Sequence, residues 1–360
     1  MKKIKVLLTL LLLGAFLSSY GQADETEEAN IARSFVIDGT VLLKFKGLES
    51  EVVIPKGVTE IADLAFANCT LVTDVEIPEG VTKIGSSAFT NCSSLESVVF
   101  PEGLKKIGSH AFYKCTSLKS VVLPDSVTKI GNCTFWYCTS LTDVKIPKGV
   151  KTISAFTFAC CESLKSVVIP DGVTEIRDLA FCGCSSLTSL KIPDSVKKIK
   201  QEAFSRCTAL KEWPISSENP WFKVDGPGLL TKDGKKLIAC LASAREYQIP
   251  DGVEVIESWA FSSCSSLTSV KIPDGVKKIG HGAFIGCSAL TSVVIPESVT
   301  KIGFYAFYSC TSLTSVEIPE SVTWIGEFVF NECPKVTIYA PKKSEAQKHA
   351  KEWKIPFKAK

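Results

Sequence analysis

Cysteine is the residue type in this sequence with the greatest capacity for chemistry. The chain has 15 cysteines among 360 residues, against three histidines and one methionine. Thiols form disulfides, bind metals or act as nucleophiles, and disulfides are the usual outcome in exported proteins. Eleven of the cysteines form a series with a 23-residue step that is broken once: Cys69, Cys92, Cys115, Cys138, Cys161, Cys184, Cys207, Cys264, Cys287, Cys310 and Cys333. Such regularity indicates one repeated packing position, so we expect buried thiols there.

Four cysteines lie outside this series, namely Cys133, Cys160, Cys182 and Cys240. Cys160 and Cys182 are 22 residues apart, one short of the repeat, which would place them on adjacent coils in adjacent columns. A Cys160–Cys182 disulfide is therefore a hypothesis that the sequence raises.

The sequence contains no recognisable catalytic or cofactor motif. His110, His281 and His349 occupy different positions of the repeat, and the Cys182-x-Cys184 pair has no second pair to complete a zinc site. A G-x-S-x-G, an H-E-x-x-H, a phosphate-binding loop and a dinucleotide fingerprint are all missing. We therefore expect no enzymatic activity, no cofactor and no metal.

The elements that position the cysteines follow from an internal repeat. Prolines recur every 23 residues at Pro55, Pro78, Pro101, Pro124, Pro147, Pro170 and Pro193, and again at Pro250, Pro273, Pro296 and Pro319. Isoleucine and phenylalanine columns keep the same step, and the unit is P-x-G/S-V-x-x-I-x-x-x-A-F-x-x-C-x-S-L-x-S-V-x-I. The pattern defines eleven coils in two blocks.

Each column has a structural role. Val98 and Phe100 show the period-two spacing of a short strand, and the next proline ends that strand because it has no N–H to donate. Ala88-Phe89-x-x-Cys92 has helical spacing over about one turn. Since one coil cannot bury its apolar side chains alone, we predict an α/β solenoid of stacked 23-residue coils, with parallel strands on one face and short helical turns on the other.

These repeats resemble those of BspA-type leucine-rich repeat proteins, also called the Treponema pallidum type. The resemblance rests on units such as Ile77-Pro78-Glu79-Gly80-Val81-Thr82-Lys83-Ile84-Gly85, followed by Ala88-Phe89 and Cys92-Ser93-Ser94-Leu95. It covers about residues 35–341. It implies a bacterial cell-surface or secreted protein, and several members of that family adhere to host proteins or to other cells. A fold alone does not establish a function.

Features outside the repeat divide the chain further. Asp38-Gly39 and Asp233-Gly234 each stand 17 residues before a repeat proline and between apolar segments, which is typical of a hairpin. We predict a hairpin cap at 35–54, repeats at 55–213, a hairpin insertion at 214–249 and repeats at 250–341. Trp213, Trp221 and Phe222 either pack over the join or form a binding loop.

A C-terminal cap is expected over residues 342–360, with a short helix that begins at Ser344, a good N-cap. This segment is basic, and contact with an anionic surface polymer is an alternative to a solvated cap.

The N-terminus explains the charge of the chain. Lys2, Lys3 and Lys5 precede an apolar stretch and small residues, the order of a secretory signal peptide over residues 1–21. The net charge of +3 equals these three lysines, so the rest of the chain is neutral. We expect an exported monomer, at the cell surface, secreted or periplasmic, with a flexible segment at 22–34 and without a transmembrane span. A neutral chain argues against nucleic-acid binding.

Two surfaces could bind a partner. Exposed aromatic residues are typical anchors of interfaces, and they are predicted near the phenylalanine turn of successive coils: Tyr113, Trp136, Tyr137 and Phe156, and then Phe304, Tyr305, Tyr308, Trp324 and Phe328. They could instead shield the turn side of the solenoid. Outward valines of the strands, such as Val122, offer a second, flatter surface. We predict recognition of a protein, as in adhesion to a host or cell surface. The alternative is a secreted carbohydrate-binding or structural module.

Overall fold

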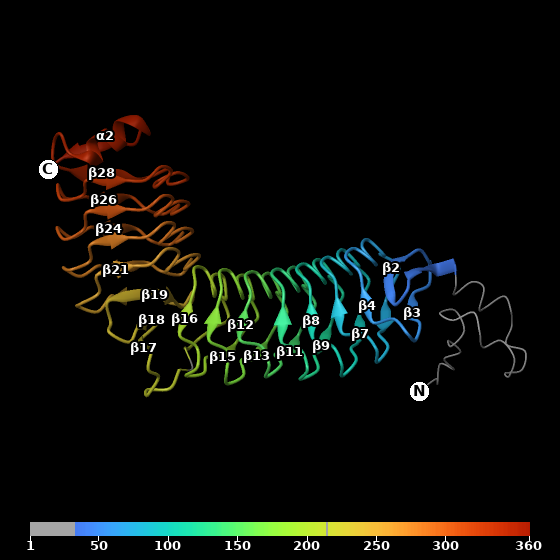
Figure 1. Ribbon diagram of the computed structural model, residues 1–360. Helices are drawn as coiled ribbons and strands as arrows, with labels where there is room; N and C mark the ends of the chain where they lie inside the picture. Colours follow the sequence, from blue (N-terminus) through green and yellow to red (C-terminus); the bar gives the residue numbers. More distant parts are fainter. Residues whose placement is uncertain (1–32, 214) are drawn as a thin grey trace, which may run out of the picture. The chain divides into compact units, whose positions relative to one another are not determined.

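Figure 1 shows the computed structural model of the chain, which describes residues 33–213 and 215–360. The predicted signal peptide lies outside these residues, as does nearly all of the segment 22–34. The chain forms two compact units, an N-terminal unit that ends at Val173 and a C-terminal unit that begins at Thr174. Within residues 33–213 and 215–360, no helix has the length and apolar character needed to cross a bilayer.

The N-terminal unit contains two columns of short parallel strands (Figure 1). In the first column the strands are three residues long and in register: β3 (Glu51–Val53), β5 (Asp74–Glu76), β7 (Ser97–Val99), β9 (Ser120–Val122), β11 (Asp143–Lys145) and β13 (Ser166–Val168). The second column has two residues per coil: β4 (Glu60–Ile61), β6 (Lys83–Ile84), β8 (Lys106–Ile107), β10 (Lys129–Ile130) and β12 (Thr152–Ile153). An antiparallel hairpin, β1 (Phe35–Asp38) and β2 (Val41–Phe45), extends the second column through β4.

The C-terminal unit repeats this plan around a hairpin of its own. It begins with β14 (Glu175–Ile176), β15 (Ser189–Lys191) and β16 (Lys198–Ile199), and then forms antiparallel strands β17 (Phe222–Asp225), β18 (Gly228–Thr231) and β19 (Lys236–Cys240). The second block has β20 (Glu246–Gln248), β22 (Ser269–Lys271), β24 (Ser292–Val294), β26 (Ser315–Glu317) and β28 (Thr337–Ala340), alternating with β21 (Val255–Ile256), β23 (Lys278–Ile279), β25 (Lys301–Ile302) and β27 (Trp324–Ile325). Helix α2 (Glu345–Glu352) and β29 (Phe357–Ala359) follow.

The core consists of the predicted columns of identical side chains. Phenylalanine rings stack from coil to coil, with centroids 4.7 Å apart for Phe66 and Phe89 and 5.1 Å apart for Phe89 and Phe112. In the C-terminal unit the centroids of Phe261 and Phe284 lie 4.6 Å apart. Each ring buries a large apolar area against its neighbours, so stacking supplies the core that a single coil lacks. The predicted solenoid of 23-residue coils is confirmed.

The segment opposite the strands differs from the expected helical turn. It is a chain of tight turns, and two residues of each coil, flanking the column phenylalanine, have positive φ. In the coil of Phe112 these are His110 (φ 58°) and Lys114 (φ 60°). An α-helix needs negative φ throughout. Tight turns also bring apolar side chains three residues apart to one side, which explains the spacing of Ala88, Phe89 and Cys92.

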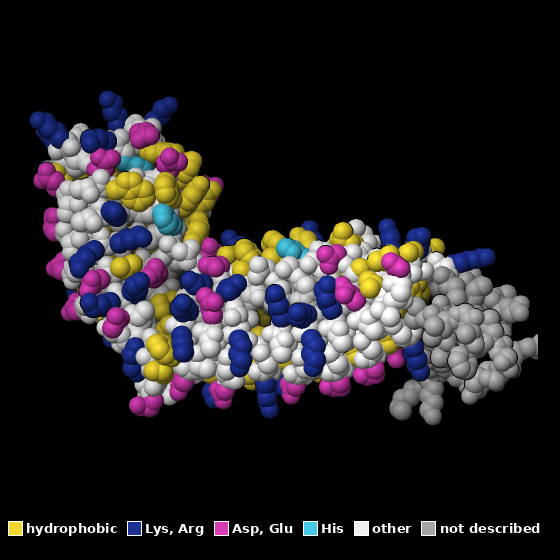
Figure 2. Space-filling view, viewed as in Figure 1, with side chains coloured by type: hydrophobic (Ala, Val, Ile, Leu, Met, Phe, Trp, Pro, Cys, Tyr) yellow, Lys and Arg dark blue, Asp and Glu magenta, His cyan; other side chains and the backbone are white. Residues whose placement is uncertain are grey.

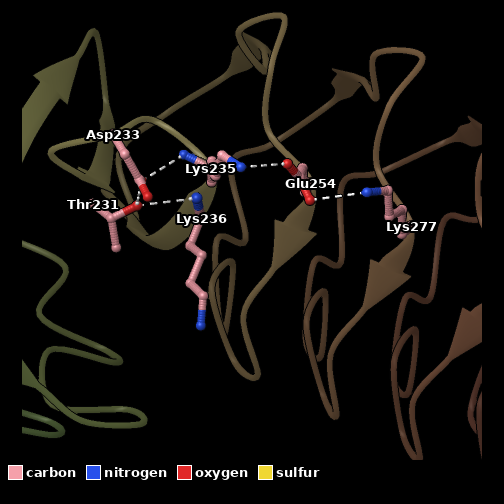
Figure 3. Close-up of polar contacts among 6 residues, drawn as sticks. All are labelled: Thr231, Asp233, Lys235, Lys236, Glu254 and Lys277. Atoms are coloured by element: carbon pink, nitrogen blue, oxygen red, sulfur yellow. Dashed lines mark hydrogen bonds and ion pairs between the residues drawn. The ribbon is translucent and has the colours of Figure 1, made fainter.

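The two hairpins make equivalent contacts with the coil that follows each of them. The N–H of Phe45 donates to Ala65 O at 2.8 Å, and the N–H of Cys240 donates to Ala260 O at 2.7 Å. The second hairpin turns at Asp233-Gly234, where Gly234 has φ 75° and Asp233 Oδ1 accepts from the N–H of Lys235 at 3.0 Å. Figure 3 shows this turn and the adjacent ion pairs of Glu254, 3.0 Å from both Lys235 and Lys277.

Candidate functional site

In each unit the tight turns of successive coils line up along one edge, which we call the turn ridge. It comprises, in each coil, the residues from three before to two after the column phenylalanine. Backbone hydrogen bonds join the ridge from coil to coil: the N–H groups of His110, Phe112 and Lys114 donate to the carbonyl oxygens of Asn132, Thr134 and Trp136 at 2.8–2.9 Å. The ridge is therefore a rigid surface on which outward side chains hold fixed positions.

The first aromatic cluster lies on the ridge of the N-terminal unit. It consists of Tyr113, Trp136, Tyr137 and Phe156, which the sequence analysis singled out. The ring of Trp136 lies 5.0 Å from Tyr113, 5.3 Å from Tyr137 and 5.2 Å from Phe156, centroid to centroid. The structure thus brings all four predicted residues into one patch, with Tyr137 exposed and the others half-buried.

Polar groups that the sequence analysis did not single out border this cluster. The Nζ of Lys114 lies 5.3 Å from the ring centroid of Tyr113, and the ring of His110 meets Tyr113 edge to face at 5.8 Å. The Cys160 thiol, whose charged form would repel a phenolate, raises the pKa of Tyr137 above its ordinary value. A tyrosine hydroxyl is protonated at neutral pH in any case, and here it adds a polar group at the border of the cluster.

The second aromatic cluster lies in the C-terminal unit. Phe304, Tyr305, Tyr308 and Phe328 belong to the turn ridge, and Trp324 of β27 packs beside them. Tyr305 stacks on Phe328 with centroids 5.2 Å apart and an interplanar angle of 12°, and Phe304 meets Trp324 edge to face at 5.2 Å. Phe304, Tyr305 and Trp324 are each 37–38% exposed. Hydrophobic side chains gather along one edge of this unit in Figure 2.

Two residues absent from the sequence-based list extend this second cluster. His281 stacks on Phe304 at 5.2 Å, and its Nδ1 accepts from the Phe304 N–H at 3.1 Å. Trp353, which follows α2, meets Phe328 edge to face at 4.9 Å. His281 stands one repeat before Phe304 in the sequence, so the column itself could have revealed it, whereas Trp353 lies outside the repeat.

Several of these aromatic residues occupy positions that disfavour them. Tyr137 (φ 62°), Phe156 (φ 58°), Tyr305 (φ 58°) and Phe328 (φ 59°) all have left-handed backbone conformations, which cost a residue with a Cβ about 1–2 kcal/mol. Sister coils carry mixed residue types at these positions: Asn68, Asn91, Gly183 and Gly286 align with Tyr137, whereas Leu64, Leu179, Trp259 and Gly282 align with Phe156, Tyr305 and Phe328. The backbone therefore does not account for the aromatic residues, and their exposed rings point to a surface role.

The strand face carries the outward valines that the sequence predicted. Val99, Val122 and Val168 are 61–75% exposed in the N-terminal unit, as is Val294 at 59% in the C-terminal unit. They are separated by charged residues such as Lys145 and by small serines. This face is less apolar and lacks the ring contacts of the ridge, and valine also favours the strand conformation by itself.

The series cysteines are buried thiols with a common contact. The Sγ of Cys92 donates to Phe66 O at 3.0 Å, and those of Cys115 and Cys138 donate to the equivalent Phe carbonyl oxygens at 3.2 Å. Burial raises the pKa of Cys92 to about 12, so its thiol is not ionised at neutral pH. Cys160 and Cys182 are partly buried thiols on different units, and the disulfide between them stays a prediction.

Of the three aromatic residues at the insertion, two are buried and all three differ from an exposed binding loop in making packing or hydrogen-bond contacts. Trp213 and Phe222 are buried, and the indole N–H of Trp213 donates to Pro227 O at 2.9 Å. Trp221 is partly exposed, and its indole N–H donates to Asp194 O at 3.1 Å. Among the residues that the structure describes, no three His, Cys, Asp or Glu side chains form a group that could hold a metal ion.

Known proteins share this architecture. A family model described as a BspA type leucine rich repeat region, in 6 copies, matches residues 44–154, 128–222 and 235–350. The crystal structure of a leucine rich cell surface protein from Faecalibacterium prausnitzii A2-165 is 35% identical, covers 88% of this chain and 94% of that chain, and has a TM-score of 0.74. A leucine-rich repeat protein from Bacteroides ovatus ATCC 8483 is 29% identical, with coverage of 89% and 94% and a TM-score of 0.51.

A third solved structure overlaps half of this chain. The leucine rich repeat protein of T. pallidum is 36% identical over 50% of this chain and 89% of that chain, with a TM-score of 0.47. No curated protein matches the chain. Since the family model spans well over half of the residues, this chain belongs to the BspA-type leucine-rich repeat family.

Proposed function

We propose that this protein is exported and recognises a protein partner at a host or cell surface through the two aromatic clusters of the turn ridge. The observation that carries the proposal is that Tyr137, Phe156, Tyr305 and Phe328 hold partly exposed rings at positive φ, a conformation that disfavours residues with a Cβ. Residues that oppose the local backbone preference and expose their rings are expected where binding selects them.

Further support comes from the surroundings of the clusters. Each cluster combines partly exposed rings with a polar border, Lys114 and the Tyr137 hydroxyl in the first and His281 in the second. Aromatic and cationic side chains of this kind dominate the binding energy of protein interfaces. The basic and apolar start of the sequence supports export, and the similar F. prausnitzii protein is described as a cell surface protein.

The test compares cluster variants with a strand-face variant in binding to a panel of immobilised host-matrix and bacterial surface proteins. We expect Trp136→Ala with Tyr137→Asn, or Trp324→Ala with Tyr305→Asn, to weaken binding at least about tenfold, as loss of interface anchors does. Val122→Thr keeps the shape of an exposed strand side chain and should leave the affinity unchanged. Circular dichroism spectra and melting temperatures would verify that each variant is folded.

Two outcomes would contradict the proposal. If the cluster variants bind as the parent does while Val122→Thr loses affinity, the strand face is the binding surface. If the parent binds no protein of the panel but binds neutral oligosaccharides on a glycan array, the rings stack on sugars and the carbohydrate-binding alternative replaces protein recognition.

A further inference from the structure

The hydrogen-bond ladder of the turn ridge has a direction, and this leaves unused donors at the end of each block. Tyr305, Phe307 and Ser309 donate their N–H groups to the carbonyl oxygens of the next coil, those of Glu327, Val329 and Asn331, at 2.9–3.1 Å. The described residues after this coil form α2 and β29, of which β29 extends the strand column and neither extends the turn ridge. Within the described residues, the N–H groups of Phe328, Phe330 and Glu332 accordingly find no acceptor.

The end of the first block has the same row of donors, but there it is enclosed. The N–H groups of Glu202, Phe204 and Arg206 have no acceptor within the described residues, although the preceding coil donates to Gln201 O, Ala203 O and Ser205 O. The hairpin and the next coil cover this row and leave a cavity of about 20 Å³. That volume is about the size of one water molecule, so this row has no room for a larger ligand.

At the end of the second block the row instead borders an open cavity of about 350 Å³. The lining residues include Phe330, Glu332, Trp353, Lys354 and Pro356. Such a volume lies in the range of small-ligand sites. The neighbouring His349 is 5% exposed, packs on the rings of Phe330 and Trp353, and has no hydrogen-bond partner at Nε2. Two residues with unused backbone N–H groups, a lysine and a tryptophan thus line one cavity.

Charge around this cavity favours an anion. Residues 342–360 contain seven lysines and two glutamates, a net charge of +5, and lysines surround α2 in Figure 2. Burial lowers the pKa of His349 to about 4, so it adds no charge at neutral pH. Among the residues that the structure describes, ion pairs join Lys348 to Glu345 and Lys360 to Glu317, and Lys354 has no ion pair. The Glu332 carboxylate accepts from the Tyr308 hydroxyl at 2.6 Å.

We propose that this C-terminal pocket binds an acidic glycan, with a carboxylate or sulfate group on the N–H groups of Phe330 and Glu332 and on Lys354. Phe330 and Glu332 alternate with Asn331, whose N–H is used within the turn, and backbone N–H groups without an internal acceptor are available to an anion. Trp353 in the wall supplies a flat ring for the sugar. Nucleic acid is disfavoured because the positive charge is confined to the cap. This site is separate from the aromatic clusters and does not depend on their function.

The experiment measures binding of a galacturonate tetrasaccharide and a sulfated chondroitin tetrasaccharide by calorimetry in 0.1 M salt. Maltotetraose is the neutral control, and a single-stranded oligonucleotide of equal charge is the nucleic-acid control. We expect Lys354→Glu to weaken binding of the acidic sugars about tenfold or more, as loss of a charged hydrogen bond does. Lys351→Glu makes the same change of charge on the same cap but lies outside the cavity lining, and it should weaken binding less than about threefold by long-range attraction alone.

Amide NMR of the same samples tests the donor row itself. The signals of Phe328, Phe330 and Glu332 should shift on titration with the acidic sugars, whereas those of Glu202, Phe204 and Arg206 should not. If Lys354→Glu and Lys351→Glu lose the same affinity for the acidic sugars, the binding depends only on the net charge of the cap, and the proposal is overturned. Unmoved amides, equal binding of maltotetraose, or tighter binding of the oligonucleotide would overturn it as well. The variants of the two aromatic clusters should bind the acidic sugars as the parent does, because their substitutions lie outside this pocket. Loss of protein binding in those variants would therefore test the proposed function and not the pocket.

Discussion

The thiol of Cys138 donates a hydrogen bond to the carbonyl oxygen of Phe112, one coil earlier, at 3.2 Å. The same carbonyl oxygen accepts from the N–H of Cys115 at 3.2 Å, so it joins two consecutive coils. A side chain that is both apolar and a weak donor suits this position, because the oxygen has a second lone pair to satisfy. Cysteine meets both needs, which explains its recurrence better than disulfide formation does.

Alkaline pH should therefore destabilise the protein. Burial raises the pKa of Cys92 to about 12 and those of Cys115, Cys138 and Cys161 well above the ordinary value. Between the pKa of an unfolded thiol and the higher folded value, the unfolded state holds fewer protons than the folded state. The free energy of unfolding then falls with rising pH, by about 1.4 kcal/mol per unit for each thiol. Urea unfolding under reducing conditions at pH 9.5 and pH 10.5, both above the pKa of an unfolded thiol, measures this slope.

A double variant separates these thiols from other titrating groups. Cys115→Ala with Cys138→Ala should reduce the slope by about 2–3 kcal/mol per pH unit, because two of the contributing groups are gone. A slope equal to that of the parent would show that the buried thiols are not its source.

Substitutions at Tyr137 should distinguish the cost of its backbone conformation from the contribution of its ring contacts. Tyr137→Asn and Tyr137→Val both remove the ring, which contacts Trp136 and Tyr113. Asparagine tolerates the φ of 62°, as Asn68 and Asn91 do in sister coils, whereas a β-branched residue does not. We expect the valine variant to unfold at a free energy about 1–2 kcal/mol below that of the asparagine variant. Equal stabilities, measured by urea unfolding, would contradict the strain inferred on the turn ridge.

The sequence predicted the columns of this fold well and its turns poorly. A step of 23 residues is visible over eleven coils, and it correctly indicated the Phe66, Cys92 and Val98 columns. The second strand column was missed because strands of two residues, such as Lys83–Ile84, show no alternation. The left-handed turn residues were mistaken for a helical turn, although the alignment of Asn68 and Asn91 with Gly183 is a recognisable sign of positive φ.

The sequence predicted the aromatic clusters but not the C-terminal pocket. The first cluster follows from counting along the repeat, since Tyr113, Trp136 and Phe156 fall on successive coils. The C-terminal pocket does not, because its donors are backbone N–H groups whose availability depends on the direction of the ridge ladder. No side-chain pattern records that direction. Only the positive charge of the cap could be read from the sequence.

Glycines that stack between coils should not tolerate a side chain. A Cβ added to Gly108 would lie 2.5 Å from the carbonyl carbon of Gly85 in the preceding coil. At Gly103 the nearest atom would be Glu79 O, at 3.3 Å. Gly108→Ala must push two coils apart and should cost roughly 2–4 kcal/mol, while Gly103→Ala should cost less than about 1 kcal/mol. Thermal unfolding of the two variants compares them, and equal melting temperatures would refute close stacking at Gly108.

Asn219 fastens the insertion to the last coil of the first block. Its side chain is fully buried, its Oδ1 accepts from the N–H groups of Trp221 and Phe222 at 2.9 Å, and its Nδ2 donates to Asp194 Oδ1 at 3.0 Å. One amide therefore satisfies two backbone donors and one carboxylate, and only asparagine has both an acceptor and a donor of this shape.

Asn219→Asp keeps both acceptor bonds but places a second carboxylate against Asp194. The repulsion raises the pKa of the new carboxyl group in the folded state, so the variant is most stable at low pH and loses stability as the pH rises. We expect a loss of about 2–3 kcal/mol relative to the parent at pH 7.5, of which part is recovered at pH 4.5. Asn219→Ala removes all three bonds and should show a deficit that does not change between these pH values. Urea unfolding of the parent and both variants at each pH measures these differences in unfolding free energy. If the loss in Asn219→Asp is the same at both pH values, Asp194 does not face residue 219.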